Sequence, residues 1–396
     1  MDFAFTPEQE AFRQEIRQWI KGNLPLDWDE VGFRAEHENR EFSRQISKKL
    51  GEKGWLASAW PKEYGGLGLS PMEQLIYKEE MNYHRVPGID MGVGGITWIG
   101  PALMILGTEE QKKEHLPPLA RGERWWCTGY SEPEAGSDMA NVRCRAVLHG
   151  DEYVINGQKL WTSGGDISDH WCWLMVRTGP EEPKHKGISL LLVDMKTPGI
   201  TLRPLIDMSG THDLNEVFYD DVHVPRKNLV GEENRGWYHS MISLDFERTT
   251  GVARASQLRR MIDELIKFAQ ETKVKDKPLA QDPLVRRKLA EITIDTEVAR
   301  MLAYRVVWMQ TKGLIPNYEA SMIKLYATEL MQQIAHVGTQ IMGLYGQLGI
   351  GSKWAPLKGA MEDAYLSTVG RTIAAGTSEI MRNIIATRGL GLPRGS

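Results

Sequence analysis

The chain has 396 residues, a net charge of -4 at pH 7 and a pI near 6.2. A chain of this length can hold about two or three packed units, and its 41% hydrophobic and 25% charged residues are ordinary for a globular protein. The weak negative charge argues against nucleic acid or an anionic membrane surface as a partner.

Cysteine usage and the N-terminus indicate the compartment. The cysteines, Cys127, Cys144 and Cys172, are sparse and lack metal-ligand spacing, which predicts a reducing compartment without a disulfide framework. The first residues lack the basic and apolar regions of a signal peptide, and no run of about eighteen apolar residues occurs. We therefore expect a cytoplasmic protein that does not span a membrane, unless a transit peptide precedes this sequence.

The pattern is helical up to about residue 120. Thr6-Pro7 and Ser70-Pro71 each place a capping hydroxyl before a proline at the first helical position. Apolar residues at helical spacing follow both signals. Between them, the stretch 60–68 contains proline and several glycines and predicts a turn-rich connector.

Short extended runs replace the helical period from about Trp126 onward. Asn156-Gly157 predicts a hairpin, because both central positions of the favoured turn need a positive φ. We expect the β segment to close at Pro225. The runs with strand character are Tyr153–Ile155, Trp171–Val176, Ile188–Val193 and Val217–Tyr219.

Long amphipathic helices return after Gly236. Asp282-Pro283 is an N-cap followed by a first-turn proline, and apolar residues then recur at three- and four-residue spacing. Long helices followed by a short last helix predict a four-helix bundle. The expected fold is α+β and multidomain, with an all-α domain over residues 1–123, a β-barrel or sandwich over 124–233 and a helical bundle over 234–396.

Two motifs about twenty residues apart contain candidate site residues. The first is the loop 129–138 and the second is the segment 156–163. A tryptophan at a strand end ordinarily packs in a core, and a Gly-Ser-Asp turn is ordinarily a capped surface turn. A flat aromatic face beside short hydrogen-bonding side chains also suits a flat heterocycle such as isoalloxazine. The residues concerned are Tyr130, Ser131, Trp161 and Ser163. The functional interpretation of the turn that contains Ser137 is backbone and hydroxyl contact with a pantetheine-like chain.

Two helical positions are also candidates. Glu247 falls within the apolar stripe after Gly236, with Arg248 beside it. A carboxylate there is ordinarily paired in the structure, but in a cavity it can abstract a carbon-bound proton. Thr377 or Ser378 can cap the last helix, whose free N–H groups can meet an anion, although a simple capped helix explains that segment as well. No G-x-G-x-x-G follows a strand, and P-loop, H-E-x-x-H and C-x-x-C motifs do not occur, so neither a nicotinamide site nor a metal is expected.

In this order and spacing, the motifs resemble those of the acyl-CoA dehydrogenases, and the resemblance extends from about residue 5 to residue 393. It implies a helical domain, a β domain and a helical bundle, with FAD between the last two. It also implies an acyl-CoA substrate and an electron-transfer flavoprotein as the electron acceptor. The resemblance implies that the flavin ring is faced by Tyr130, Ser131, Trp161 and Ser163. It implies that Gln340 and Gly343 approach the adenosine end of an FAD held mainly by a neighbouring subunit, and that Thr377 and Glu379 face FAD. It also implies that the acyl-CoA channel is lined by Ser137, Asp245 and Arg248.

The catalytic carboxylate departs from the commoner pattern of this family. Many members carry it just before the Gly-Thr-Ser of the last helix, where this chain has Ala375. Asp245-Phe-Glu-Arg248 matches members that place the base on the bundle helix, as isovaleryl-CoA and long-chain dehydrogenases do, which makes Glu247 the expected base. The backbone N–H of Ala375 keeps the expected role of stabilising the thioester carbonyl, because a backbone donor survives loss of the side chain.

Two further departures concern the cofactor and the assembly. Ser131 replaces the commoner threonine and keeps a hydroxyl. The family's Arg-x-x-Phe-Gly segment, whose arginine reaches the FAD diphosphate across an interface, is not matched by residues 272–278. We expect a homotetramer; the alternative is an α2β2 heterotetramer whose partner chain supplies the arginine, as in relatives acting on steroid or dicarboxylic acyl-CoAs. The alternative functions are an acyl-CoA oxidase and an FAD-sharing, non-catalytic subunit of a heteromeric dehydrogenase.

Overall fold

The computed structural model of the chain describes residues 5–28, 39–92, 94–166, 171–247 and 251–393, with only the backbone described over 244–247. Contacts divide the chain into two compact units. The helical unit comprises Met1–Ala35, Leu69–Val86 and Arg248–Ser396; the β unit comprises Glu36–Gly68 and Pro87–Glu247. The N-terminal helices are thus divided between the two units, and the domain boundaries after residues 123 and 233 remain predictions.

Local capping sets the start of the main helices in the helical unit. Thr6 and Ser70 each form a capping box with the third residue of the helix that follows. Asp282 accepts two N–H groups of the first turn of its helix. All three predicted helix starts are confirmed. The α-helices of this unit are α1 (Pro7–Asn23), α5 (Pro71–Tyr83), α9 (Gly251–Glu271), α10 (Pro283–Thr311), α11 (Tyr318–Met342), α12 (Ala360–Arg371) and α13 (Ser378–Ile384).

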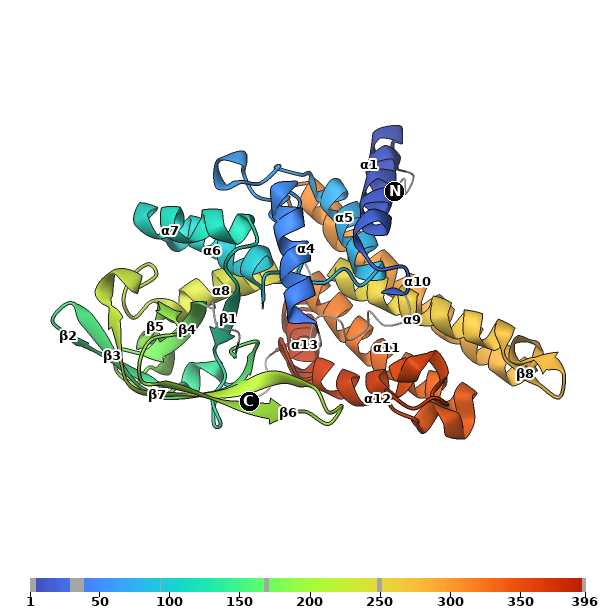
Figure 1. Cartoon of the computed structure of the whole chain (residues 1–396). Helices are drawn as coiled ribbons and strands as arrows, with labels where there is room; N and C mark the ends of the chain where they lie inside the picture. Colours follow the sequence, from blue (N-terminus) through green and yellow to red (C-terminus); the bar gives the residue numbers. More distant parts are fainter. Residues whose placement is uncertain (1–4, 29–38, 93, 167–170, 248–250, 394–396) are drawn as a thin grey trace. The chain divides into compact units, whose positions relative to one another are not determined.

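The long helices α9 and α10 run side by side to a small hairpin at their far end (Figure 1). Its strands are β8 (Lys273–Val274) and β9 (Lys277–Pro278). The two loop residues, Lys275 and Asp276, both have positive φ, 49° and 65°, as the favoured two-residue hairpin turn requires. In the described part of the chain, no helix combines the length and apolar character needed to cross a membrane.

The β unit is built on a mixed seven-stranded sheet, which confirms the predicted β domain between the helical segments of the chain. The strand order is β1-β4-β2-β3-β7-β6, and β5 pairs with β4. Helices α4 (Arg40–Glu52), α6 (Gly100–Leu106), α7 (Glu109–Ala120) and α8 (Gly236–Glu247) belong to the same unit. The strands are β1 (Trp126–Gly129), β2 (Arg145–His149), β3 (Glu152–Ser163), β4 (Trp171–Arg177), β5 (Ile188–Asp194), β6 (Ile200–Ile206) and β7 (His212–Pro225).

Strands β4 and β5 form the centre of the β unit because both are continuous apolar runs and almost every residue in them is buried. All three cysteines lie in this core as free thiols. Burial raises the pKa of the Cys144 thiol to about 11. These thiols therefore behave as small apolar side chains of the sheet.

The prediction of a hairpin at Asn156-Gly157 is wrong. Strand β3 continues through both residues and pairs with β7 on either side of them, with a register shift between Ile155 and Gly157. Gly157 has a φ of 145°, and a Cβ there would lie 2.7 Å from Cys144 Cα. A glycine is required here because the backbone at Cys144 approaches closely at a bulge. Asn-Gly is also typical of turns, which is why the sequence pattern predicted a hairpin.

Candidate active site

The two motifs singled out in the sequence lie side by side in the β unit. The loop 129–138 leaves the end of β1, and 156–163 forms the second half of β3. The Leu160 N–H donates to the Ser131 carbonyl over 2.9 Å, and Lys159 Nζ donates to the Tyr130 carbonyl over 3.1 Å. These bonds bring the loop residues Tyr130 and Ser131 alongside the part of β3 that ends in Trp161 and Ser163. We call these four residues, which the resemblance assigns to the flavin ring, the cradle.

Trp161 has an unusual backbone. It falls in a second register shift of β3, between Lys159 and Thr162, where β3 has one more residue than β7. Its φ is 63°, which is a rare and strained value for a bulky residue. The side chain is 57% exposed, although Lys159 and Thr162 on either side of the bulge are buried. A bulge that turns an indole outward is typical of a functional site rather than of core packing.

Tyr130 connects the cradle to helix α8. Its hydroxyl lies 3.2 Å from Ser243 Oγ, and Ser243 Oγ donates to the Ser240 carbonyl over 2.9 Å. Because the single serine proton is used in that bond, the Tyr130 hydroxyl donates to Ser243. The Trp98 ring stacks on Tyr130 with centroids 6.0 Å apart.

Helix α8 ends at Glu247, four positions beyond the fully buried Ser243. The contact between Tyr130 and Ser243 therefore anchors the helix that carries the expected base to the cradle, within one unit. The side chains of Asp245 and Glu247 lie outside the described residues, and so does Arg248 altogether. Ser137 lies exposed in the loop 129–138.

The start of α13 has the geometry predicted for it. Thr377 is the N-cap and accepts the Ile380 N–H, as expected. Backbone N–H donation at Glu379, then the Thr377 hydroxyl, hold the pKa of the exposed Glu379 carboxyl below its usual value. Just before the cap, Ala375 is exposed with a φ of 55°, and its N–H has no hydrogen-bond partner among the described residues. That N–H is therefore available as a donor.

The residues predicted for the adenosine end lie at the end of α11 in the helical unit. Gln340 is exposed, and its side chain is held by Lys288 and His336. Gly343, the residue that follows the helix, has a φ of 61°, and a Cβ there would meet open space. Its conformation, rather than crowding, thus favours glycine.

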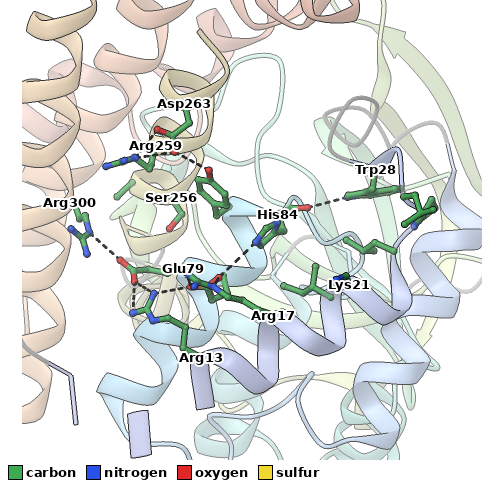
Figure 2. Close-up of a pocket in the computed structure, with 17 residues that line it drawn as sticks. Arg13, Arg17, Lys21, Trp28, Glu79, His84, Ser256, Arg259, Asp263 and Arg300 are labelled. Carbon is green, nitrogen blue, oxygen red and sulfur yellow. Dashed lines mark hydrogen bonds and ion pairs between the residues drawn. The ribbon is translucent and has the colours of Figure 1, made fainter. Parts of the chain in front are cut away.

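A cavity of about 730 Å³ lies elsewhere in the helical unit, among α1, α5, α9 and α10 (Figure 2). Its two glutamates are each paired twice: Glu80 with Arg13 and Arg17, and Glu79 with Arg13 and Arg300. Its aspartate, Asp263, pairs with Arg259. None of the predicted site residues lines this cavity. The cavity therefore lies at a charge-paired helix junction and is not the site indicated by the sequence.

Three residues of the cradle region were not foreseen from the sequence. Glu132 and Lys159 lie inside the two motifs and form a buried ion pair, and Ser243 holds Tyr130. Their signals are weak: a lysine or glutamate in a loop or strand is ordinarily exposed, and a serine in a helix has no obvious partner.

An exposed, strained tryptophan beside a hydroxyl-bearing loop fits a flat, amphipathic heterocycle such as a flavin ring. Three family models match the chain: the acyl-CoA dehydrogenase N-terminal domain over residues 6–123, the middle domain over 127–222 and the C-terminal domain over 234–390. The chain belongs to the acyl-CoA dehydrogenase family, whose members use a flavin to oxidise the CH–CH bond of acyl-CoA thioesters.

Individual relatives agree with this assignment along the whole chain. Acyl-CoA dehydrogenase FadE26 of Mycobacterium tuberculosis (strain ATCC 25618 / H37Rv) is 36% identical, over 100% of this chain and 99% of its own length. The structure of the ChsE4-ChsE5 complex from Mycobacterium tuberculosis is 35% identical with a TM-score of 0.90, and the match covers 100% of both chains. The Tcur3481-Tcur3483 steroid ACAD is 34% identical with a TM-score of 0.90, also over 100% of both chains.

Proposed function

We propose that this chain uses FAD to convert an acyl-CoA thioester to its trans-2-enoyl-CoA, with the cradle as the site of the flavin ring. The observation that carries the proposal is the outward-turned Trp161, at φ 63° and 57% exposed, beside the loop that contains Tyr130 and Ser131. An indole face with neighbouring hydroxyls and backbone groups fits a planar, amphipathic ring. Gln340, Gly343, Thr377 and Glu379 hold the remainder of an FAD, some of them across a subunit interface.

Glu247 acts as the base that removes the α-proton of the acyl group. The Ala375 N–H, which has no partner among the described residues, stabilises the negative charge that develops on the thioester oxygen. Asp245, Arg248 and Ser137 position the acyl-CoA. Bound FAD would supply the acceptor for the β-hydrogen as hydride, and an electron-transfer flavoprotein would take up the electrons. Trp161 would cover the flavin ring and exclude water from it.

The variant Glu247→Gln tests the base assignment. It is expected to lower turnover by about 10²- to 10⁴-fold while FAD remains bound, because the amide keeps the shape of the side chain but cannot accept the proton. Turnover is measured with an artificial electron acceptor, and FAD content from the visible spectrum. Glu271→Gln, an exposed change at the end of α9, serves as the control and is expected to leave turnover unchanged. A Glu247→Gln enzyme with most of its activity would show that the base lies elsewhere.

The hairpin between α9 and α10 favours an α2β2 heterotetramer over the homotetramer. Where the family's interface arginine is expected, this chain has the lysine-rich segment Lys273–Pro278. The relatives named as the ChsE4-ChsE5 and Tcur3481-Tcur3483 assemblies also contain two kinds of chain. A partner that supplies the arginine completes the FAD site. FAD content and mass, measured for the chain alone and after co-expression with a second chain that carries the Arg-x-x-Phe-Gly segment, distinguish the two assemblies.

A further inference from the structure

A single buried ion pair lies behind the cradle. Lys159 is fully buried, its partner Glu132 is 8% exposed, and Lys159 Nζ lies 2.7 Å from Glu132 Oε1. Lysine is almost never fully buried unless it is paired. A buried ion pair is nevertheless a weak source of stability compared with well-packed apolar residues of the same size. The contacts of this pair therefore need a further explanation.

The pair joins the two segments that form the cradle. Lys159 lies in β3, two positions before Trp161, and Glu132 follows Ser131 in the loop 129–138. Lys159 Nζ also donates to the Tyr130 carbonyl over 3.1 Å. Together with the bond from the Leu160 N–H to the Ser131 carbonyl, this fixes both loop carbonyls against β3.

Glu132 has further partners on the far side of the loop. Its carboxylate accepts the Arg143 N–H over 2.6 Å and the Cys144 N–H over 3.0 Å, at the start of β2. One carboxylate thus connects the loop to two strands of the sheet. Lys159 is the only ion-pair partner of Glu132 among the described residues, although the charge of the buried Arg177 also acts on Glu132. Removing either Lys159 or Glu132 therefore leaves a buried charge without its ion pair next to the cradle.

We infer that Lys159 and Glu132 are positioning residues of the flavin site. The pair holds the loop of Tyr130 and Ser131 in register with Trp161, and the cancellation of its two charges keeps the potential behind the flavin ring close to neutral. This inference rests on the proposed function. It extends that function by assigning the affinity for the cofactor, and part of its reduction potential, to two residues that do not contact it.

The variant Lys159→Met separates these roles. It frees the Tyr130 carbonyl and leaves the Glu132 carboxylate without a cation. We expect the FAD dissociation constant to rise by on the order of tenfold or more. We also expect the midpoint potential of the bound flavin to become more negative, because a lone carboxylate opposes the charge gained on reduction. The double variant Lys159→Met/Glu132→Gln contains no lone charge, so its potential returns towards that of the wild type while its FAD affinity stays low.

The measurements use the full chain, co-expressed with its partner chain if the wild type needs one to hold FAD. The control is Arg85→Met, which breaks the mostly buried ion pair of Arg85 with Glu264 at 2.8 Å in the helical unit, where Glu264 keeps Arg260 as a partner. It is expected to lower the thermal stability of the FAD-free chain and to leave the FAD dissociation constant and the potential unchanged. A purely structural role for Lys159 predicts this same pattern for Lys159→Met.

A folded Lys159→Met protein with wild-type FAD affinity and potential, which is the pattern expected of Arg85→Met, would overturn the inference. If Lys159→Met does not fold, FAD affinity is measured for the double variant Lys159→Met/Glu132→Gln instead. Wild-type FAD affinity in that variant would contradict the role of the pair. Wild-type protein that holds no FAD under any of these conditions overturns the proposed function itself. The two failures are therefore distinguishable.

Discussion

The two units of this chain bury charge in different ways. At the helix junction of the helical unit, Glu79 and Glu80 share Arg13, and each has a second arginine partner, Arg300 and Arg17 respectively. In the β unit, Lys159 and Glu132, with 0% and 8% exposure, form an ion pair in which neither residue has a second ion-pair partner among the described residues. The buried Arg177 acts on Glu132 without forming an ion pair with it. The helical junction is therefore a network of shared ion pairs, whereas the pair behind the cradle is a single one.

This difference indicates which charges carry function. The outer arginines of the network, Arg17 and Arg300, are 48% and 37% exposed, so it tolerates the loss of one of them, because water and Arg13 solvate the remaining carboxylates. A single buried pair does not tolerate such a loss, and it adds little stability compared with well-packed apolar residues. The single pair lies where two segments of a site must be held together, so we assign it to the site, and we assign the network to the attachment of α1 to α5 and α10.

The largest expected effect on stability is that of Lys159→Met in the cofactor-free chain. It leaves a carboxylate buried without a cation, which costs about 3–5 kcal/mol. Arg17→Met in the helical unit is the matched change, because Arg17 is half exposed and Glu80 keeps Arg13. It should cost no more than about 1 kcal/mol. Chemical unfolding followed by tryptophan fluorescence measures both, and equal costs would remove the distinction between the two units.

A second comparison uses glycine. In the β unit, Gly157→Ala places a Cβ 2.7 Å from Cys144 Cα, so we expect a loss of about 1–3 kcal/mol. In the helical unit, Gly370 lies exposed in α12 with nothing within 4 Å of a Cβ. Gly370→Ala is therefore expected to stabilise the chain by about 0.5–1 kcal/mol. The same unfolding measurement applies, and a tolerated Gly157→Ala would mean that β3 can shift away from Cys144.

A pH dependence is also expected in the β unit. Burial first, then the charges of Arg124 and Lys227, lower the pKa of His115 to about 3. Arg124 Nη1 lies 3.1 Å from His115 Nδ1, and because arginine can only donate, the ring accepts there and stays neutral. The unfolded chain binds this proton near pH 6.5 and the folded chain does not. The contribution of His115 to the free energy of unfolding is therefore fully present above pH 6.5 and is lost as the pH falls towards 3.

Between pH 6.5 and pH 5 that loss amounts to about 1–2 kcal/mol. His115→Gln keeps an acceptor for Arg124 and cannot take up the proton, so its free energy of unfolding should vary less over this interval. Unfolding curves at several pH values measure the slope for both proteins. Equal slopes would show that His115 does not contribute to the pH dependence.

Helix starts were predictable from the sequence because their causes are local. Thr6, Ser70, Asp282 and Thr377 each cap the helix that follows them, and each needs only the next few residues to do so. The pairing of the two cradle motifs could also be anticipated, since the resemblance placed Tyr130 and Trp161 at one site. What the resemblance could not give is the strained bulge that turns Trp161 outward.

Features that depend on distant neighbours were not predictable. Asn156-Gly157 has the composition of a turn, and only the approach of Cys144 and the pairing with β7 show why a glycine lies there inside a strand. Lys159 looks like a surface residue until Glu132, 27 positions earlier, is placed beside it. Local chemistry determined the elements, and tertiary packing determined which of their side chains are buried.

The most direct test of this account is an anaerobic absorbance scan of the purified protein before and after addition of linear, branched and steroid acyl-CoAs. The account predicts flavin bands that bleach with at least one thioester, and that stay bleached until an electron acceptor is added. Rapid recovery in air alone would instead favour an oxidase. Flavin bands that no thioester changes, or a protein without flavin even after co-expression with a partner chain, would contradict the account.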